Sequence, residues 1–213
     1  SPNFADLAVA PKGSAKPKDK TRRSERVFLN VPYDPAYEGI FLALIAAVTA
    51  TGKLPYCTLQ VASFEDRRDR MFKLIESCAF SIHDITMKDR LNMPFELGYA
   101  LAVERHRIKG RHRVLVVSDD AHEAVKRLSD LNGKDVQPHK MSPSTATSLA
   151  LSQLKSWPGP QPTTAVLAVA KRLVKAAPKF VEQHAATSIY DTAVFNALRY
   201  AAIAECEQRG LLG

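Results

Sequence analysis

The sequence has few cysteines, and their spacing fits no metal site. Among its 213 residues are 3 cysteines, Cys57, Cys78 and Cys206, which are far apart and form no CxxC or Cys/His ligand pattern. An odd number of scattered cysteines is typical of proteins in a reducing compartment. We therefore expect a cytoplasmic protein without a structural zinc site or another metal.

A long apolar run is also missing. The longest one, residues 40–50, is too short to cross a bilayer and is typical of a buried or amphipathic helix. No segment has the charged, apolar and small-residue blocks of a secretory signal. Apolar residues make up 46% and charged residues 24%, as in ordinary globular proteins, so we expect no membrane partner.

Two glycine motifs that hold phosphates are absent. The chain contains neither GxGxxG nor GxxxxGK[ST], so the ordinary dinucleotide and P-loop sites lack their glycines. A phosphate would have to bind amides at a helix N-terminus or Arg and Lys side chains. The cluster Arg67, Arg68 and Arg70 could hold one near the second strand, although such clusters usually form a solvated helix face.

Positive charge is concentrated at the start of the chain. The formal net charge is +8, and residues 1–26 set Lys12, Lys16, Lys18, Lys20, Arg22, Arg23 and Arg26 against Asp6, Asp19 and Glu25. This Pro-, Lys- and Ser-rich segment has little to bury, so we predict a disordered leader over residues 1–25. Its composition favours a solubilising linker, and a nucleic-acid-binding arm that contacts phosphates is the alternative.

Strand and helix patterns alternate over residues 26–140. Short apolar runs predict strands at 27–32, 54–60, 80–85, 114–117 and 135–139, the last at a sheet edge, and helical periodicity predicts helices near 40–50, 71–78, 94–102 and 126–131. Such alternation implies right-handed crossovers and a mainly parallel, doubly wound five-stranded α/β sheet with helices on both faces. Residues 141–213 are predicted to be a helical extension, interrupted by prolines at 157–162.

Ligands of such sheets collect beyond the carboxyl ends of the strands, where the strand order reverses. That rule selects residues 30–34, 83–84 and 92–98. The candidate substrate-binding residues in these segments and their flanks are Asn30, Pro32, Tyr33, His83, Asn92, Met93, Gly98 and Tyr99. Tyr33 or Tyr99 could stack on a base.

Three segments of the chain form a recognisable set: Val27-Phe-Leu-Asn-Val-Pro-Tyr-Asp34, Ile82-His-Asp-Ile85 and Asn92-Met-Pro-Phe-Glu-Leu-Gly-Tyr-Ala100. Together they resemble the nucleoside 2-deoxyribosyltransferase-like and TIR-like superfamily. The resemblance covers residues 26–140 and implies a flavodoxin-like (TIR-like) domain. Its strongest element is Glu-Leu-Gly-Tyr-Ala, which resembles the Glu-x-Gly-x-Ala helix of the deoxyribosyltransferases. By this resemblance, Glu96 takes the catalytic glutamate position and Asp84 that of an acidic partner.

The segment before this helix differs from the deoxyribosyltransferases. They usually carry Asp-x-Gly-Thr there, whereas this chain has Arg90-Leu-Asn-Met-Pro. The difference favours the TIR-like side, whose catalytic members hydrolyse NAD. The resemblance thus implies an N-glycosidase with NAD or another nucleotide as substrate or ligand, a role in stress or antiviral defence, and assembly as a homo-oligomer or larger complex. The alternative is a non-catalytic TIR-like module that binds a nucleotide signal or mediates assembly.

The residue chemistry agrees with a catalytic carboxylate. Breaking an N-glycosidic bond builds positive charge on the sugar, which a carboxylate can stabilise or bond to. We expect Glu96 on the first turn of a helix opened by Pro94, where the helix dipole keeps it ionised. The same place suits an acidic residue that only caps the helix.

The neighbouring candidates also have two interpretations each. Asp84 is expected to share one cleft with Glu96 and to orient a sugar hydroxyl or assist the leaving base, or it only caps a turn. His83 is more often a packed, hydrogen-bonded histidine than a base. Gly98 is expected to allow close packing or ligand approach.

Overall fold

The computed structural model describes residues 22–60, 67–87, 90, 92–106, 111–131, 133–154 and 161–212. Most of the predicted leader and most of the proline-rich break at 157–162 therefore lie outside the described residues. Among the helices described, none is both long and apolar enough to cross a membrane.

The centre of the molecule is a parallel sheet. Its strands are β1 (Arg26–Asn30), β2 (Leu54–Tyr56), β3 (Phe80–Asp84), β4 (Arg113–Ser118) and β5 (Val136–Pro138). All pairings are parallel and the order is β2-β1-β3-β4-β5. This is the strand order of flavodoxin-like doubly wound folds, and it confirms the predicted fold class with β5 at an edge. β2 is shorter than predicted, because a 3₁₀ helix follows it at Thr58–Gln60.

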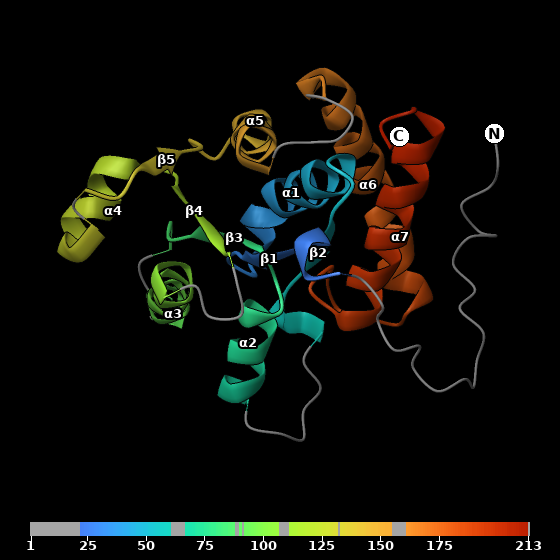
Figure 1. The fold of residues 1–213 in the computed structure, drawn as a ribbon. Helices are drawn as coiled ribbons and strands as arrows, with labels where there is room; N and C mark the ends of the chain where they lie inside the picture. The colour runs from blue at the N-terminus through green and yellow to red at the C-terminus, as the bar shows by residue number, and fades with distance from the viewer. Residues whose placement is uncertain are drawn as a thin grey trace.

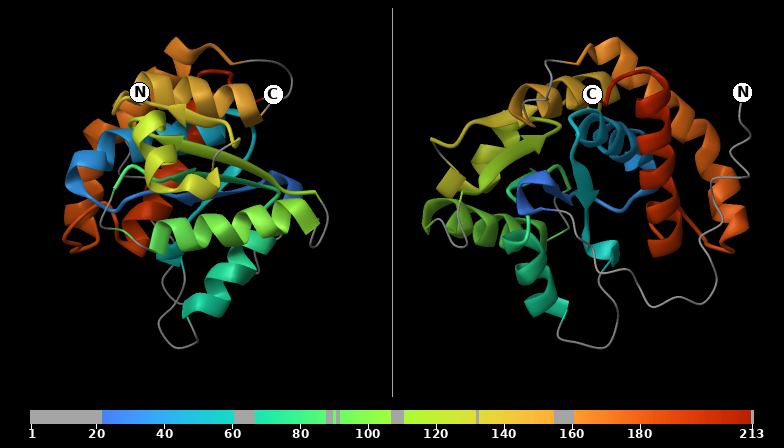
Figure 2. Two further views of the ribbon diagram at one scale, coloured as in Figure 1. Left: turned by 90° about the vertical axis from the view of Figure 1, so that its left-hand side faces the viewer. Right: turned by 45° about the vertical axis from the view of Figure 1, so that its right-hand side comes forward.

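Helices cover both faces of the sheet. They are α1 (Glu38–Ala50), α2 (Arg67–Glu76), α3 (Asn92–His106), α4 (Ala121–Arg127), α5 (Pro143–Leu154), α6 (Thr163–Gln183) and α7 (Thr192–Gln208). The chain runs from β1 outward to β2 and then back past β1 to β3, so right-handed crossovers place α1 on one face and α2 and α3 on the other. Figures 1 and 2 show these layers, with α5, α6 and α7 around α1.

Helix α1 joins the sheet to the C-terminal helices. Each of its residues from position 40 to position 50 is buried, which is typical of a helix surrounded by protein on all sides. Sheet residues such as Leu29, helix α6 through Leu173 and helix α7 through Phe195 belong to the same buried cluster. The predicted helical extension at 141–213 thus shares one core with the sheet.

The folded part begins earlier than predicted. A short 3₁₀ helix, Arg23–Glu25, precedes β1. The Arg23 guanidinium donates hydrogen bonds to the carbonyl oxygens of Glu76 and Arg111, both at 2.8 Å. The predicted leader boundary at residue 25 is therefore wrong, because this arginine ties its segment to α2 and to the chain before β4.

The shared core makes a testable prediction. The Phe195 ring is fully buried and stacks on Phe41 of α1 with 5.7 Å between ring centroids. Phe195→Ala should lower the free energy of unfolding by about 3–5 kcal/mol, because it leaves a cavity between α1 and α7. Urea unfolding measures the change.

The matched control on the same helix is Tyr200→Ala, because the Tyr200 side chain is 66% exposed. It should change the stability by no more than about 0.5 kcal/mol. If both substitutions changed the free energy of unfolding equally, the prediction that α7 shares one core with α1 and the sheet would be contradicted.

Candidate functional site

A pocket of about 600 Å³ lies beyond the carboxyl end of β1. Its walls come from the segment after β1, the start of the 3₁₀ helix after β2, the first half of α2, and Arg90 with the first turns of α3. The lining residues are Asn30, Val31, Pro32, Tyr33, Thr58, Arg68, Met71, Arg90, Asn92, Met93, Phe95 and Glu96. Because β1 lies between β2 and β3, the pocket sits where the strand order reverses, the usual ligand site of these sheets.

Several predicted site residues meet in this pocket. Those that line it are Asn30, Pro32, Tyr33, Asn92, Met93 and Glu96. His83 lies behind the wall, where it contacts Asn30. The described lining does not include Asp84, Gly98 or Tyr99.

Glu96 is the acidic residue in the described lining of the pocket. Only 7% of its surface is exposed, and the Asn92 side-chain amide donates a hydrogen bond to its Oε1 at 3.4 Å. Helix α3 begins at Asn92, before Pro94, and its first turn contains no acidic residue. The expectation that Glu96 lies on the first turn is therefore wrong. The helix dipole acts mainly within that turn, so burial and polar neighbours, such as Asn92, define the environment of this carboxylate.

Tyr33 forms a neutral wall beside Glu96. Burial raises the pKa of its phenol well above the ordinary value, and the nearby thiol of Cys57 and the Glu96 carboxylate raise it further. Its hydroxyl lies 2.8 Å from Thr58 Oγ1. The phenol thus stays protonated and contributes shape and polarity to the site.

The mouth of the pocket carries positive charge and an aromatic ring. Arg68 comes from the arginine cluster that the sequence left as either a solvated face or a phosphate site, and Arg90 precedes α3. Arg90 Nη2 donates to the Tyr33 carbonyl oxygen at 3.4 Å. Phe95 also lines the pocket and is 55% exposed. Sequence reasoning missed Phe95, Thr58 and Met71. No local pattern shows that these three side chains, which come from three separate elements, face the same pocket.

Asp84 does not share the cleft with Glu96. Side chains alternate between the two faces of a strand. His83 therefore faces the α3 side with Asn30, its register partner, while Asp84 faces the α1 side with Ile82. The Asp84 side chain has no exposed surface, and its Oδ2 lies 2.8 Å from His139 Nε2. The sheet itself separates the two carboxylates, so the expectation of one shared cleft is wrong.

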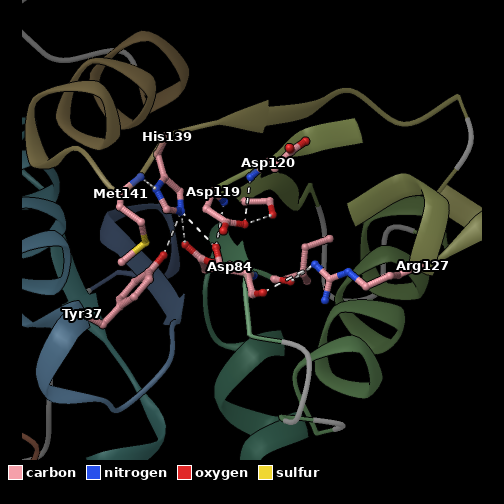
Figure 3. A network of polar contacts seen from close by, with 10 residues as sticks. Tyr37, Asp84, Asp119, Asp120, Arg127, His139 and Met141 are labelled. Carbon is pink, nitrogen blue, oxygen red and sulfur yellow. Dashed lines mark hydrogen bonds and ion pairs between the residues drawn. The ribbon is translucent and has the colours of Figure 1, made fainter. Parts of the chain in front are cut away.

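The partners of Asp84 form a buried network (Figure 3). The Met141 backbone N–H donates to His139 Nδ1 at 3.1 Å, so the ring proton is on Nε2, the nitrogen that lies 2.8 Å from the Asp84 carboxylate. Tyr37 Oη lies 2.9 Å from the same nitrogen, and the Thr86 backbone N–H donates to Asp84 Oδ1 at 2.9 Å. This network ties the end of β3 to the segments after β1 and β5. No local sequence pattern marks His139 as a partner of Asp84.

The backbone turns at Lys140 and Met141, so that the Met141 N–H reaches the His139 ring. Both adopt left-handed conformations, with φ of 53° and 51°. Such conformations cost about 1–2 kcal/mol per non-glycine residue. The buried hydrogen bonds of the network offset this cost locally.

The remaining candidates are structural. His83 is fully buried, and burial lowers its pKa to about 3, so it is too weak a base for catalysis near neutral pH. The Tyr99 hydroxyl donates to Glu76 at 2.5 Å, and its ring stacks on Phe72. A methyl group added at Gly98 would meet nothing within 4 Å, and the residue is exposed, so the expected close packing there is wrong.

Within the described ranges, no group of three or more His, Cys, Asp or Glu residues is arranged to hold a metal ion. Comparison with known proteins adds nothing to this geometry: no family, no curated protein and no solved structure matches the chain. The function has to be inferred from the site alone.

The position of Asp84 makes a testable prediction. Its Oδ1 accepts from the Thr86 N–H and its Oδ2 lies 2.8 Å from His139 Nε2, whereas an asparagine puts an NH₂ donor in place of one of these oxygens. Asp84→Asn should lower the free energy of unfolding by about 1–3 kcal/mol, because one buried donor loses its acceptor. Asp69→Asn is the control, since Asp69 is 59% exposed in a 3.8 Å pair with Arg68. Identical urea midpoints for the two variants would show that the buried pair does not stabilise the fold.

Proposed function

We propose that the chain is a nucleotide N-glycosidase that cleaves the bond between a ribose and its base, with Glu96 beside the anomeric carbon. One observation carries the proposal: a carboxylate that is 7% exposed lines a pocket of about 600 Å³ at the point of strand-order reversal. A pocket of this volume suits a nucleotide-sized ligand. The resemblance of its three segments to TIR-like and deoxyribosyltransferase-like proteins points the same way.

The lining fits the parts of a nucleotide. Arg68 and Arg90 supply guanidinium groups for phosphate oxygens, which the chain needs because it lacks a glycine-rich phosphate loop. The exposed ring of Phe95 offers a surface on which a base can stack. With phosphate at the arginines and the base at the ring, the sugar between them comes toward Glu96.

The chemistry required of Glu96 is electrostatic or nucleophilic. As the C1′–N bond breaks, its electron pair leaves with the base and positive charge develops on the sugar. A carboxylate in a site with little water stabilises that charge strongly or bonds to the carbon. Water then adds its hydroxyl to C1′ and releases its proton, which completes the hydrolysis.

NAD is the substrate that fits this site best. Among the described residues that line the pocket, Glu96 is the only acidic one, because Asp84 lies across the sheet. A purine leaves easily only if it is protonated, which calls for a second acid. Nicotinamide is attached through a positively charged ring nitrogen and leaves as a neutral molecule, so its departure needs no proton donor.

The same observation supports a second candidate. A pocket whose described lining contains one carboxylate can also bind a nucleotide without cleaving it, as a non-catalytic TIR-like sensing or assembly module. A role in defence or stress signalling and assembly into oligomers are supported by the sequence resemblance alone, and they belong to either candidate. A cytoplasmic location is supported by the scattered cysteines.

Base release tests the proposal. The protein is incubated with saturating NAD, ATP or deoxyadenosine, and the released base is measured by chromatography. Glu96→Gln keeps the shape of the side chain and removes its charge, so NAD turnover should fall roughly a hundredfold or more while the affinity changes little. Glu207→Gln, an exposed carboxylate on α7, should match the wild type.

Two outcomes would count against catalysis by Glu96. Equal turnover by the wild type and Glu96→Gln, with both folded by thermal melts, excludes this carboxylate. Measurable nucleotide binding without base release from any substrate replaces the enzyme with the sensing module.

A further inference from the structure

Asn30 is built into the wall of the pocket. It is the last residue of β1, it lines the pocket, and only 5% of its surface is exposed. Its side-chain nitrogen Nδ2 lies 3.0 Å from His83 Nδ1 and 3.4 Å from the carbonyl oxygen of Met93. A carbonyl oxygen only accepts hydrogen bonds, so the contact with Met93 orients the amide with its nitrogen toward the protein.

This orientation leaves the amide oxygen for a ligand. The two N–H groups of Asn30 are directed to His83 and Met93, and among the described residues no donor forms a hydrogen bond with its Oδ1. An amide oxygen accepts hydrogen bonds and cannot donate them. Its partner in the pocket must therefore be a donor, and next to an anomeric carbon the available donors of a nucleotide are the sugar hydroxyls.

His83 has a polar atom whose burial needs an explanation. Since Nδ1 accepts from Asn30, the ring proton is on Nε2, and this atom is buried without a hydrogen-bond partner among the described residues. Leaving such a donor unpaired costs about 1–3 kcal/mol. An apolar side chain would avoid that cost. A histidine at this position, unlike an apolar residue, supplies the acceptor Nδ1 that holds the Asn30 amide in place.

We propose that Asn30 is a specificity-determining residue that accepts a hydrogen bond from a ribose hydroxyl, and that His83 is the positioning residue that holds its amide in place. The inference rests on the proposed nucleotide site and deepens it, because it defines the substrate class as ribonucleotides. A deoxynucleotide leaves the Asn30 oxygen unpaired in a closed site, which weakens its binding.

Binding measurements test this directly with the full chain. AMP, whose purine the site is not expected to release, is titrated calorimetrically beside its 2′-deoxy and 3′-deoxy forms. The wild type should bind the ribonucleotide roughly three- to tenfold tighter than one of the two deoxy forms, the change expected for one hydrogen bond. Asn30→Ala should bind both with equal Kd, whereas Tyr200→Ala should keep the wild-type preference.

Two substitutions of His83 separate positioning from stability. His83→Leu removes the acceptor, so the preference for the ribonucleotide should fall. The free energy of unfolding should change little, because the unpaired Nε2–H is removed while one Asn30 N–H loses its acceptor. His83→Asn places an amide oxygen near the position of Nδ1 and should restore the preference. A purely structural His83 would change the stability and leave the ratio of the two Kd values as in the wild type.

The outcomes distinguish this inference from the proposed function. Equal wild-type affinities for the ribonucleotide and both deoxy forms, or a preference that persists in Asn30→Ala, would overturn the role of Asn30 and leave the nucleotide site standing. No binding of AMP or its deoxy forms by the wild type would overturn both.

Discussion

The alternation of side chains at the end of β3 determines which polar residues can meet a ligand. His83 and Asp84 are neighbours in sequence, yet they face opposite layers, and each is engaged by a residue of its own layer. His83 holds Asn30 in the wall of the pocket, whereas Asp84 binds His139 beneath α5. One strand therefore supports a ligand site on one face and a buried structural network on the other.

Helix α1 is buried in the layer on the other face of the sheet from the pocket. The sheet covers one side of α1, and α5, α6 and α7 cover the rest, so the layer opposite the pocket is densely packed. On the pocket side, α2 and α3 leave a hollow at the carboxyl end of β1. Ligand sites on parallel sheets are commonly formed by the segments that follow the strands, which can vary while the core stays fixed.

Much of the fold and part of the site could be predicted from the sequence. Alternating strand and helix patterns placed the five strands, and the apolar run at 40–50 indicated a buried or amphipathic helix at the position of α1. The rule for carboxyl ends of strands selected Asn30 and Glu96 correctly as pocket residues. Strand alternation also implied that residues 83 and 84 face opposite ways, but only the packed structure shows that α3 covers the face of His83.

Other features depend on contacts between distant segments. His139 lies 55 residues from Asp84, and no local pattern marks it as a partner of that carboxylate. Pro94 suggested a helix start, but the helix begins at Asn92, which moved Glu96 beyond the first turn. For Arg68 the sequence favoured a solvated helix face over a ligand contact, and only the position of α2 shows that this residue lines the pocket.

The central claim is that a nucleotide binds in this pocket with its anomeric carbon beside Glu96. The most direct measurement is a crystal structure of Glu96→Gln with NAD, since this variant should bind the substrate without consuming it. The account predicts a ribose between Asn30 and residue 96, with phosphates toward Arg68 and Arg90. NAD bound elsewhere, or in the pocket with its ribose carbons turned away from residue 96, would contradict it.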